Sequence, residues 1–168
     1  TARPGRDGRE VHRAFDTRRE RLVALKRLRT DLVGEPGYQE RFRRECRLAA
    51  RLTSPHVVPI HDFGEIDGQL FLDMRLIEGD DIAAVLETSG ALPPARAVAM
   101  AAQVADALDC AHRDGLVHRD VKPSNVLVAG DGGRDFVYLA DFGIVRSTGT
   151  GSGTSLTGTG AAIGTTAN

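Results

Sequence analysis

The stretch His118-Arg119-Asp120-Val121-Lys122-Pro123-Ser124-Asn125 carries more chemistry than any other part of this 168-residue chain. It places the carboxylate of Asp120, the ammonium of Lys122 and the amide of Asn125 close together in sequence. Such a set can orient a hydroxyl, neutralise a transferring phosphoryl group and hold a metal ion.

Composition favours a soluble globular chain of one domain or two small lobes, because hydrophobic residues make up 41% and charged residues 27%. A formal net charge of -1 gives no reason to expect nucleic acid as a partner. Cys46 and Cys110 lack the spacing of a disulfide framework or a zinc site, which favours a reduced, cytoplasmic protein. No apolar run reaches the length of a membrane span. The first residue is Thr1, so we expect a fragment of a longer protein.

The first half of the sequence is predicted to be mostly strands. Residues 1–10 have no periodicity and are predicted to be a loop. Apolar residues recur along one face of residues 38–53, which predicts a helix carrying Glu45 beside that face. Asp67-Gly68 predicts a hairpin turn, and Pro59 predicts an edge or bulged strand. The expected strands are residues 11–16, 22–28, 57–63 and 69–77.

The second half is predicted to be mostly helical. Helices are expected at residues 82–88 and 93–113, followed by strands at residues 126–129 and 136–140. One stripe of the longer helix is predicted to be buried, and its members are Val98, Ala101, Ala105, Leu108 and Ala111 or His112. Residues 147–168 are rich in Gly, Ser and Thr and are expected to be disordered. This order predicts an α+β chain in two lobes.

Four separated motifs carry a resemblance to a known family. They are Val23-Ala24-Leu25-Lys26, Glu45 in the first helix, the stretch 118–125, and Asp141-Phe142-Gly143. In this order they resemble a eukaryotic-like serine/threonine protein kinase, most similar to the receptor-type kinases of actinobacteria. The resemblance implies a protein-kinase-like fold truncated after its activation loop. Its parts would be an N-terminal lobe with hinge (1–77), a partial C-terminal lobe (78–146) and an activation loop (147–168).

The resemblance also implies roles for the charged residues. Asp120 would orient the hydroxyl of the substrate, and Lys122 would lie near the γ-phosphate of ATP. Asn125 and Asp141 would hold Mg²⁺, with Mn²⁺ as an alternative ion. Lys26 would contact the α- and β-phosphates and would be held by Glu45. Arg119 would bind a phosphate on the activation loop.

Other residues follow from the same resemblance. Met74 would be the gatekeeper, Arg75, Leu76 and Ile77 would form the hinge that meets adenine, and Val11, Ala24 and Leu127 would sandwich the ring. His118 and Phe142 are expected to serve packing. Thr157 and Thr159 would be autophosphorylated, and Thr165 would contact the catalytic loop.

The chain departs from the family pattern in two places. Pro4, Arg6 and Arg9 stand where the family has the glycines of its phosphate-binding loop, and a short deletion that shifts Gly5 and Gly8 is an alternative explanation. The side chains of Asp7 and the arginines prevent the close backbone approach that glycine allows. The chain also stops at Asn168, before the Ala-Pro-Glu motif and the helices that complete the C-terminal lobe. We therefore expect the fragment alone to be weakly stable and to have little peptide-kinase activity.

Three functions remain open from the residues. The leading one is phosphoryl transfer from ATP to serine or threonine of a protein substrate, in a parent that can form a homodimer and can be anchored to the cell membrane outside this chain. The second is a pseudokinase that binds nucleotide or regulates partners, favoured by the missing glycines. The third is a metal-dependent hydrolase that uses His112, His118, Asp120 and Asp141.

Overall fold

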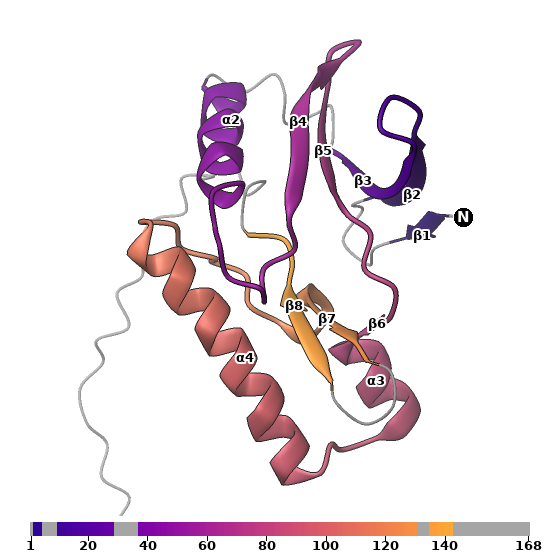
Figure 1. Ribbon diagram of the computed structural model, residues 1–168, viewed down its shortest axis with the longest axis vertical. Helices are drawn as coiled ribbons and strands as arrows, with labels where there is room; N and C mark the ends of the chain where they lie inside the picture. The colour runs from indigo at the N-terminus through magenta and orange to yellow at the C-terminus, as the bar shows by residue number, and fades with distance from the viewer. Residues whose placement is uncertain (1, 5–9, 29–36, 131–134, 143–168) are drawn as a thin grey trace, which may run out of the picture.

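Two stacked bodies form the structure, a computed structural model that describes residues 2–4, 10–28, 37–130 and 135–142. The upper body in Figure 1 is a five-stranded sheet with one helix at its side. The lower body contains two helices and a three-stranded sheet. This arrangement agrees with the predicted α+β class.

The upper sheet is antiparallel, in the order β1-β2-β3-β5-β4. Its strands are β1 (Ala2–Pro4), β2 (Glu10–Asp16), β3 (Arg21–Arg27), β4 (Ile60–Ile66) and β5 (Gln69–Arg75). The continuous apolar run of β3 is explained by its central place between β2 and β5. The predicted loop at residues 1–10 is wrong for Ala2–Pro4, because pairing with β2 makes this segment a strand. Three residues are too few for a periodicity to be seen.

Helix α2 (Tyr38–Ala49) lies beside β4 (Figure 1). It buries Phe42, Cys46 and Ala49, three members of the predicted apolar face. The helix ends at Ala49 instead of Thr53, and Ala50 and Arg51 form a turn. Pro55 follows shortly after and disfavours helical geometry in the residue before it.

The β4–β5 hairpin confirms the predicted turn, since Asp67 has φ 51° and Gly68 has φ 76°. The strand that follows Pro59, β4, lies at the edge of the sheet, as predicted. The register of β4 against β5 shifts between Ile60 and Asp62. The strand begins at Ile60 and not at Val57. Val57 instead forms a parallel bridge with Leu139 of the lower sheet.

The lower body places its sheet between two helices. The sheet order is β6-β7-β8. Asp81 caps α3 by accepting a hydrogen bond from the backbone nitrogen of Ala84 at 2.9 Å. The two-residue strand β6 was not predicted, because it has no pattern of its own. The elements are β6 (Asp80–Asp81), α3 (Ile82–Ser89), α4 (Pro94–Arg113), the 3₁₀ turn η1 (Pro123–Asn125), β7 (Val126–Ala129) and β8 (Phe136–Leu139).

Helix α4 packs against β8 with a face that overlaps the predicted stripe only in the last turns of the helix. Val98 is 69% exposed, and Ala101 and Ala105 are exposed as well. The buried residues are instead Met100, Ala107, Cys110 and Ala111. Gln103 fixes this orientation, because its Oε1 accepts a hydrogen bond from the backbone nitrogen of Val137 at 2.9 Å. The first part of the predicted stripe therefore lies on the outer side of the helix, whereas Leu108 packs against the core and Ala111 is buried, as predicted.

One hydrophobic core runs through both bodies and includes Phe42 and Leu70 above with Met100 and Leu139 below. Backbone hydrogen bonds connect the two bodies, since Leu139 donates to the carbonyl of His56 at 2.7 Å and accepts from the backbone nitrogen of Val58 at 3.1 Å.

Among the described helices, none has the length and apolar composition needed to cross a membrane.

Candidate active site

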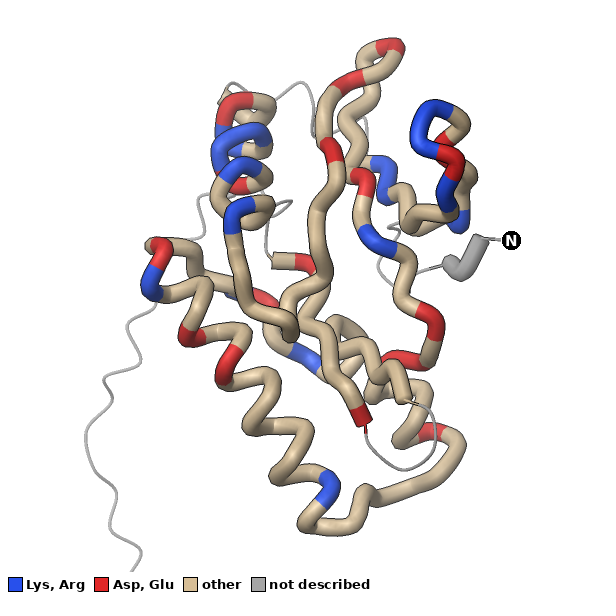
Figure 2. Tube along the Cα trace, viewed as in Figure 1, with Lys and Arg blue, Asp and Glu red and all other residues tan. Residues whose placement is uncertain are grey.

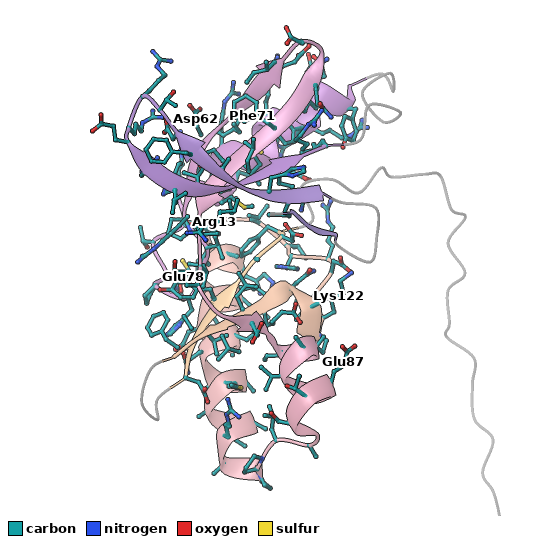
Figure 3. All side chains as sticks on the ribbon, turned by 90° about the vertical axis from the view of Figure 1, so that its right-hand side faces the viewer. Arg13, Asp62, Phe71, Glu78, Glu87 and Lys122 are labelled. Carbon is teal, nitrogen blue, oxygen red and sulfur yellow. The ribbon has the colours of Figure 1, made fainter. Side chains whose placement is uncertain are left out.

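The stretch 118–125 connects α4 to β7 between the two bodies. Figure 3 places Lys122 below the upper sheet and above the helices of the lower body. The loop is closed by a hydrogen bond from the backbone nitrogen of Asn125 to the carbonyl of Lys122 at 2.9 Å. The carbonyl of Asn125 accepts from the backbone nitrogen of Ala140 at 2.8 Å, which brings the loop beside Asp141.

Asp120, Lys122 and Asn125 converge as predicted. The Lys122 ammonium lies 3.4 Å from Oδ2 of Asp120. The amide nitrogen of Asn125 donates to the Asp120 carbonyl at 2.7 Å and lies 3.4 Å from Asp120 Oδ2. Because Asn125 is buried and its nitrogen is engaged, its oxygen Oδ1 is the atom that remains to bind a cation.

Lys26 reaches the same region from β3. Its side chain is buried, and its ammonium donates a hydrogen bond to Oδ1 of Asp141 and forms an ion pair with it. Asp141 follows β8 and has a left-handed backbone with φ 60°, a conformation that costs free energy for a residue other than glycine. The predicted phosphate-binding lysine and the predicted metal-binding carboxylate are thus partners of each other.

The prediction that Glu45 holds Lys26 is wrong in this structure. Glu45 instead forms an ion pair with Arg119, with 3.4 Å between its Oε1 and the guanidinium. The physical reason is competition, because Asp141 already satisfies the Lys26 ammonium and Arg119 satisfies the Glu45 carboxylate. Burial raises the pKa of Glu45, although the positive charges of Arg119, Arg41 and Arg44 act in the opposite direction.

His118 links the loop to the strand that precedes Asp141. Its Nε2 lies 2.8 Å from the carbonyl of Ala140, and its Nδ1 lies 3.3 Å from the backbone nitrogen of Asp120. A carbonyl only accepts, so Nε2 carries the hydrogen and Nδ1 accepts. The ring packs on Phe142 with 4.7 Å between centroids. Both nitrogens are engaged, which fits the expected packing role.

Comparison with known proteins decides the family, since residues 5–162 match the model described as the protein kinase domain. The chain belongs to the protein kinase domain family. The resemblance to bacterial serine/threonine kinases is confirmed by two relatives. The chain is 57% identical over 139 residues to the serine/threonine-protein kinase PknE of Mycobacterium bovis, covering 83% of this chain and 24% of that protein. It is 51% identical over 156 residues to PknH of the same organism, covering 93% of this chain and 25% of that protein.

Solved structures confirm the kinase fold. A variant of the PknI kinase domain from Mycobacterium tuberculosis superimposes with a TM-score of 0.76 and 35% identity. The match covers 86% of this chain and 58% of that kinase domain. The chain therefore spans about a quarter of its curated relatives and just over half of a solved kinase domain.

The residues predicted to bind adenine in this kinase domain come from both bodies. Val11 lies opposite Lys26, and Ala24 lies opposite Met74, in neighbouring strands. Leu127 belongs to β7 below, and it packs against the same core as Ala24 and Ile77. The backbone nitrogen of Arg75 already donates to the carbonyl of Pro59 at 2.9 Å. Adenine binding by these residues remains a prediction.

Several predicted residues lie outside the described part of the chain. These are Arg6 and Arg9 of the altered glycine loop and Thr157, Thr159 and Thr165 of the activation loop.

The structure does not assemble the residues of the metal-dependent hydrolase. His112 is exposed on α4, whereas both ring nitrogens of His118 are engaged within the kinase loop. Among the described residues, no group of three or more His, Cys, Asp or Glu side chains is placed to hold a metal ion. A site built from His112, His118, Asp120 and Asp141 is therefore not supported.

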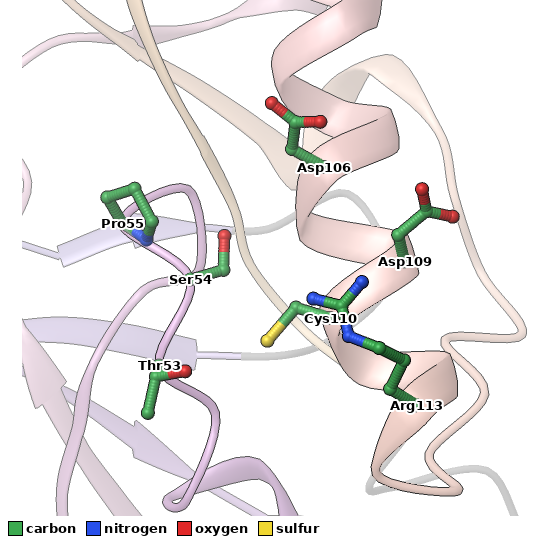
Figure 4. Close-up of a pocket in the computed structure, with 7 residues that line it drawn as sticks. All are labelled: Thr53, Ser54, Pro55, Asp106, Asp109, Cys110 and Arg113. Carbon is green, nitrogen blue, oxygen red and sulfur yellow. The ribbon is translucent and has the colours of Figure 1, made fainter.

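A separate hollow of about 330 Å³ lies between the loop after α2 and the last turns of α4 (Figure 4). None of the predicted kinase residues lines it, so it is not part of the candidate active site. Its lining residues are Thr53, Ser54, Pro55, Asp106, Asp109, Cys110 and Arg113.

The buried ring of His118 makes the stability of this fold sensitive to acid. Burial lowers the pKa of His118 from its ordinary value of 6.5, although the Ala140 carbonyl and the charges of Asp141 and Asp120 favour the protonated ring. The unfolded chain therefore binds the proton first as the pH falls. We expect the free energy of unfolding to be highest above pH 6.5 and to decrease as the pH falls through that value.

Urea unfolding at a series of pH values from about 8 to about 5.5 measures this dependence. The His118→Gln variant keeps an amide donor but does not titrate, so its stability should change less over the same interval. Glu45 has a raised pKa and gives a slope of the opposite sign, centred at lower pH. A pH slope as steep in His118→Gln as in the wild type would exclude His118 as its source.

Proposed function

We propose that the protein to which this chain belongs transfers the γ-phosphoryl group of ATP to serine or threonine hydroxyls of proteins. One observation carries the proposal, the meeting of Asp120, Lys122 and Asn125 on one loop with the Lys26–Asp141 pair beside it. Membership of the protein kinase domain family and the names of its relatives support the same reaction.

Asp120 takes the role of orienting the attacking hydroxyl and accepting its proton. The side chains of Lys122 and Asn125 both approach Oδ2 of its carboxylate, which restrains the orientation of the group. Lys122 also places a positive charge close to the attacking oxygen, where it would stabilise the negative charge of the transferring phosphoryl group.

The donor atoms present fit Mg²⁺, with Mn²⁺ as an alternative. Mg²⁺ prefers carboxylate and carbonyl oxygens, and it keeps phosphates and waters as its other ligands. The Asp141 carboxylate and Asn125 Oδ1 are donors of this kind, and Asn125 is oriented by its bond to Asp120. When bound, the ion supplies positive charge to the ATP phosphates. Lys26, which pairs with Asp141 in this structure, would contact the ATP phosphates.

Activation of the kinase belongs to the proposal as well. We infer that Thr157 and Thr159 are autophosphorylated and that the parent works in the cytoplasm, where ATP and protein substrates are present. A homodimer would bring the activation loop of one copy to the active site of the other.

The alternative, a pseudokinase, rests on Arg6 and Arg9 in place of glycines and on the missing Lys26–Glu45 pair.

The test compares the full-length parent with its Asp141→Asn variant. We expect Mg²⁺ with ATP to phosphorylate Thr157 or Thr159 in the wild type, as mapped by mass spectrometry. Without the carboxylate the ion is held poorly, so phosphate incorporation should fall by at least about 100-fold.

Nucleotide binding separates the kinase from the pseudokinase. In the wild type, Mg²⁺ should tighten ATP binding, and this gain should be reduced in Asp141→Asn. Tight ATP binding by the wild type without any phosphate incorporation would support the pseudokinase. Equal incorporation in the two proteins would contradict the proposed metal site.

A further inference from the structure

The outer side of α2 carries three arginines that the candidate active site does not use, and basic residues recur along this helix in Figure 2. Arg44 and Arg47 lie in the helix, and Arg51 follows in the turn after it. Steps of three and four residues place the three side chains on one face, which we call the arginine row. Arg44 stands half a turn from Phe42, so the row lies opposite the face that packs on the core. All three arginines are exposed.

The arginine row has no acidic partner of its own. Arg43 of the same helix is paired, with 3.5 Å between its guanidinium and Oε2 of Glu65. Within the residues that the structure describes, the three arginines of the row form neither an ion pair nor a side-chain hydrogen bond. Their guanidinium donors are therefore available to a group from outside the chain.

Stabilisation of the helix explains only part of the row. Arg47 lies in the last turn of α2, where a positive charge is favourable at the negative end of the helix dipole. Arg44 lies about a turn earlier, and Arg51 lies beyond the end of the helix. Glu40 is on the same face four residues before Arg44, but no ion pair joins the two within the described part of the chain. The face therefore keeps an excess of positive charge.

The spacing of the row suits carboxylates on an extended chain. A guanidinium binds a carboxylate through two parallel hydrogen bonds. From Arg44 to Arg51 the row extends about 10 Å, because each residue of a helix rises about 1.5 Å. Alternate residues of an extended chain lie about 7 Å apart and point to the same side. Two or three acidic side chains of one short segment can therefore contact the row together.

A membrane surface suits the row less well. Helices that lie on membranes combine basic residues with exposed large apolar residues. The apolar side chains of α2 face the core instead, since Tyr38, Phe42 and Ala49 are buried. The exposed large hydrophobic residues of the described chain all lie outside α2. The row thus offers charge without an apolar face that could enter a bilayer.

We propose that the arginine row is a docking surface for an acidic segment of a partner protein, rich in aspartate and glutamate. Docking at this surface requires no phosphoryl transfer, so it is independent of the proposed function. The row faces away from the core, whereas Glu45 of the same helix contacts Arg119 of the catalytic loop. A docked segment and the catalytic loop therefore use different sides of α2.

The experiment measures binding of an acidic peptide without ATP. The probe is a fluorescein-labelled peptide of ten residues in which glutamate alternates with glycine, and the reference peptide has glutamine in place of glutamate. Each is added to the full-length parent, and Kd is measured by fluorescence anisotropy. We expect the glutamate peptide to bind and the glutamine peptide not to bind measurably. Raising the salt concentration from about 50 mM to about 300 mM should weaken the binding, because exposed charges are screened.

Variants of single charges locate the binding surface. Arg44→Gln, Arg47→Gln and Arg51→Gln should each weaken peptide binding about threefold, and the triple variant at least about tenfold. Glu40→Gln should tighten binding about twofold, because it removes a negative charge from the same face. Arg18→Gln is the matched control, since Arg18 is exposed in the turn between β2 and β3, and its Kd should equal that of the wild type. Circular dichroism melting checks that each variant is folded.

Equal values of Kd in the wild type and the triple variant would overturn the proposal, because the peptide would then bind elsewhere. A loss in Arg18→Gln as large as in the triple variant would overturn it as well, because the attraction would then depend on net charge alone. Vesicles of phosphatidylglycerol and phosphatidylcholine test the other occupant. Vesicle binding that the triple variant loses, without binding of the glutamate peptide, would assign the row to a membrane and reject the acidic segment.

Discussion

We expect the Asp120→Asn variant of the full-length protein to phosphorylate a threonine peptide about 10²- to 10⁴-fold more slowly than the wild type. Asparagine keeps the size of the side chain and its contact with Asn125, but it cannot accept the proton of the attacking hydroxyl. The amide is also neutral, so it no longer attracts Lys122, which lies 3.4 Å away. The loss should therefore appear in kcat, with a small change in the KM for ATP.

Steady-state kinetics with radiolabelled ATP measures the effect. Asp109→Asn is the matched control, because Asp109 is exposed on α4 and lines the separate hollow. Its kcat should equal that of the wild type. A kcat of Asp120→Asn within about threefold of the wild type would mean that another group accepts the proton.

The second large effect is expected for Gly79→Ala, at the start of the lower body. Gly79 has φ 152°, and a Cβ atom there would lie 2.1 Å from the carbonyl oxygen of Val128. The obstacle is backbone of the paired strand β7, so it cannot move aside without breaking the pairing of Asp80 with Val128. We expect the free energy of unfolding to fall by at least about 3 kcal/mol.

Chemical unfolding of both proteins measures the loss. Gly68→Ala provides the control, since Gly68 also has a positive φ of 76° but has no atom within 4 Å of the added Cβ. That change carries only the conformational cost, about 1 kcal/mol. Equal losses for the two variants would show that the contact with Val128 is relieved by a small shift of the backbone.

Local sequence patterns predicted the turns and strands whose formation depends mainly on neighbouring residues. The Asp67-Gly68 turn follows from two residues that accept a positive φ, and β3 follows from one uninterrupted apolar run. The convergence of Asp120, Lys122 and Asn125 was also foreseen, since all three lie on one short loop. For the remaining motifs, the resemblance to protein kinases supplied the roles, because their order in the sequence matches that of the family.

What sequence reasoning missed depends on competition between distant groups. A helix periodicity shows on which face Glu45 lies but not which cation pairs with it, and in the structure that cation is Arg119. Similarly, the apolar stripe of α4 indicates a face but not its partner, and Val98 is exposed. The need for glycine at position 79 appears only when the segment after the hinge lies against β7.

Arg119 has φ 62°, a backbone geometry that glycine or asparagine adopts at lower cost. Its side chain is about half exposed, and its ion pair with Glu45 adds little to stability. A chain selected only to fold would therefore prefer a different residue here. The presence of arginine means that the protein accepts a less stable loop to keep a guanidinium at this point. Glycine or asparagine at this single position would relieve the backbone cost, and the loop would lose its guanidinium.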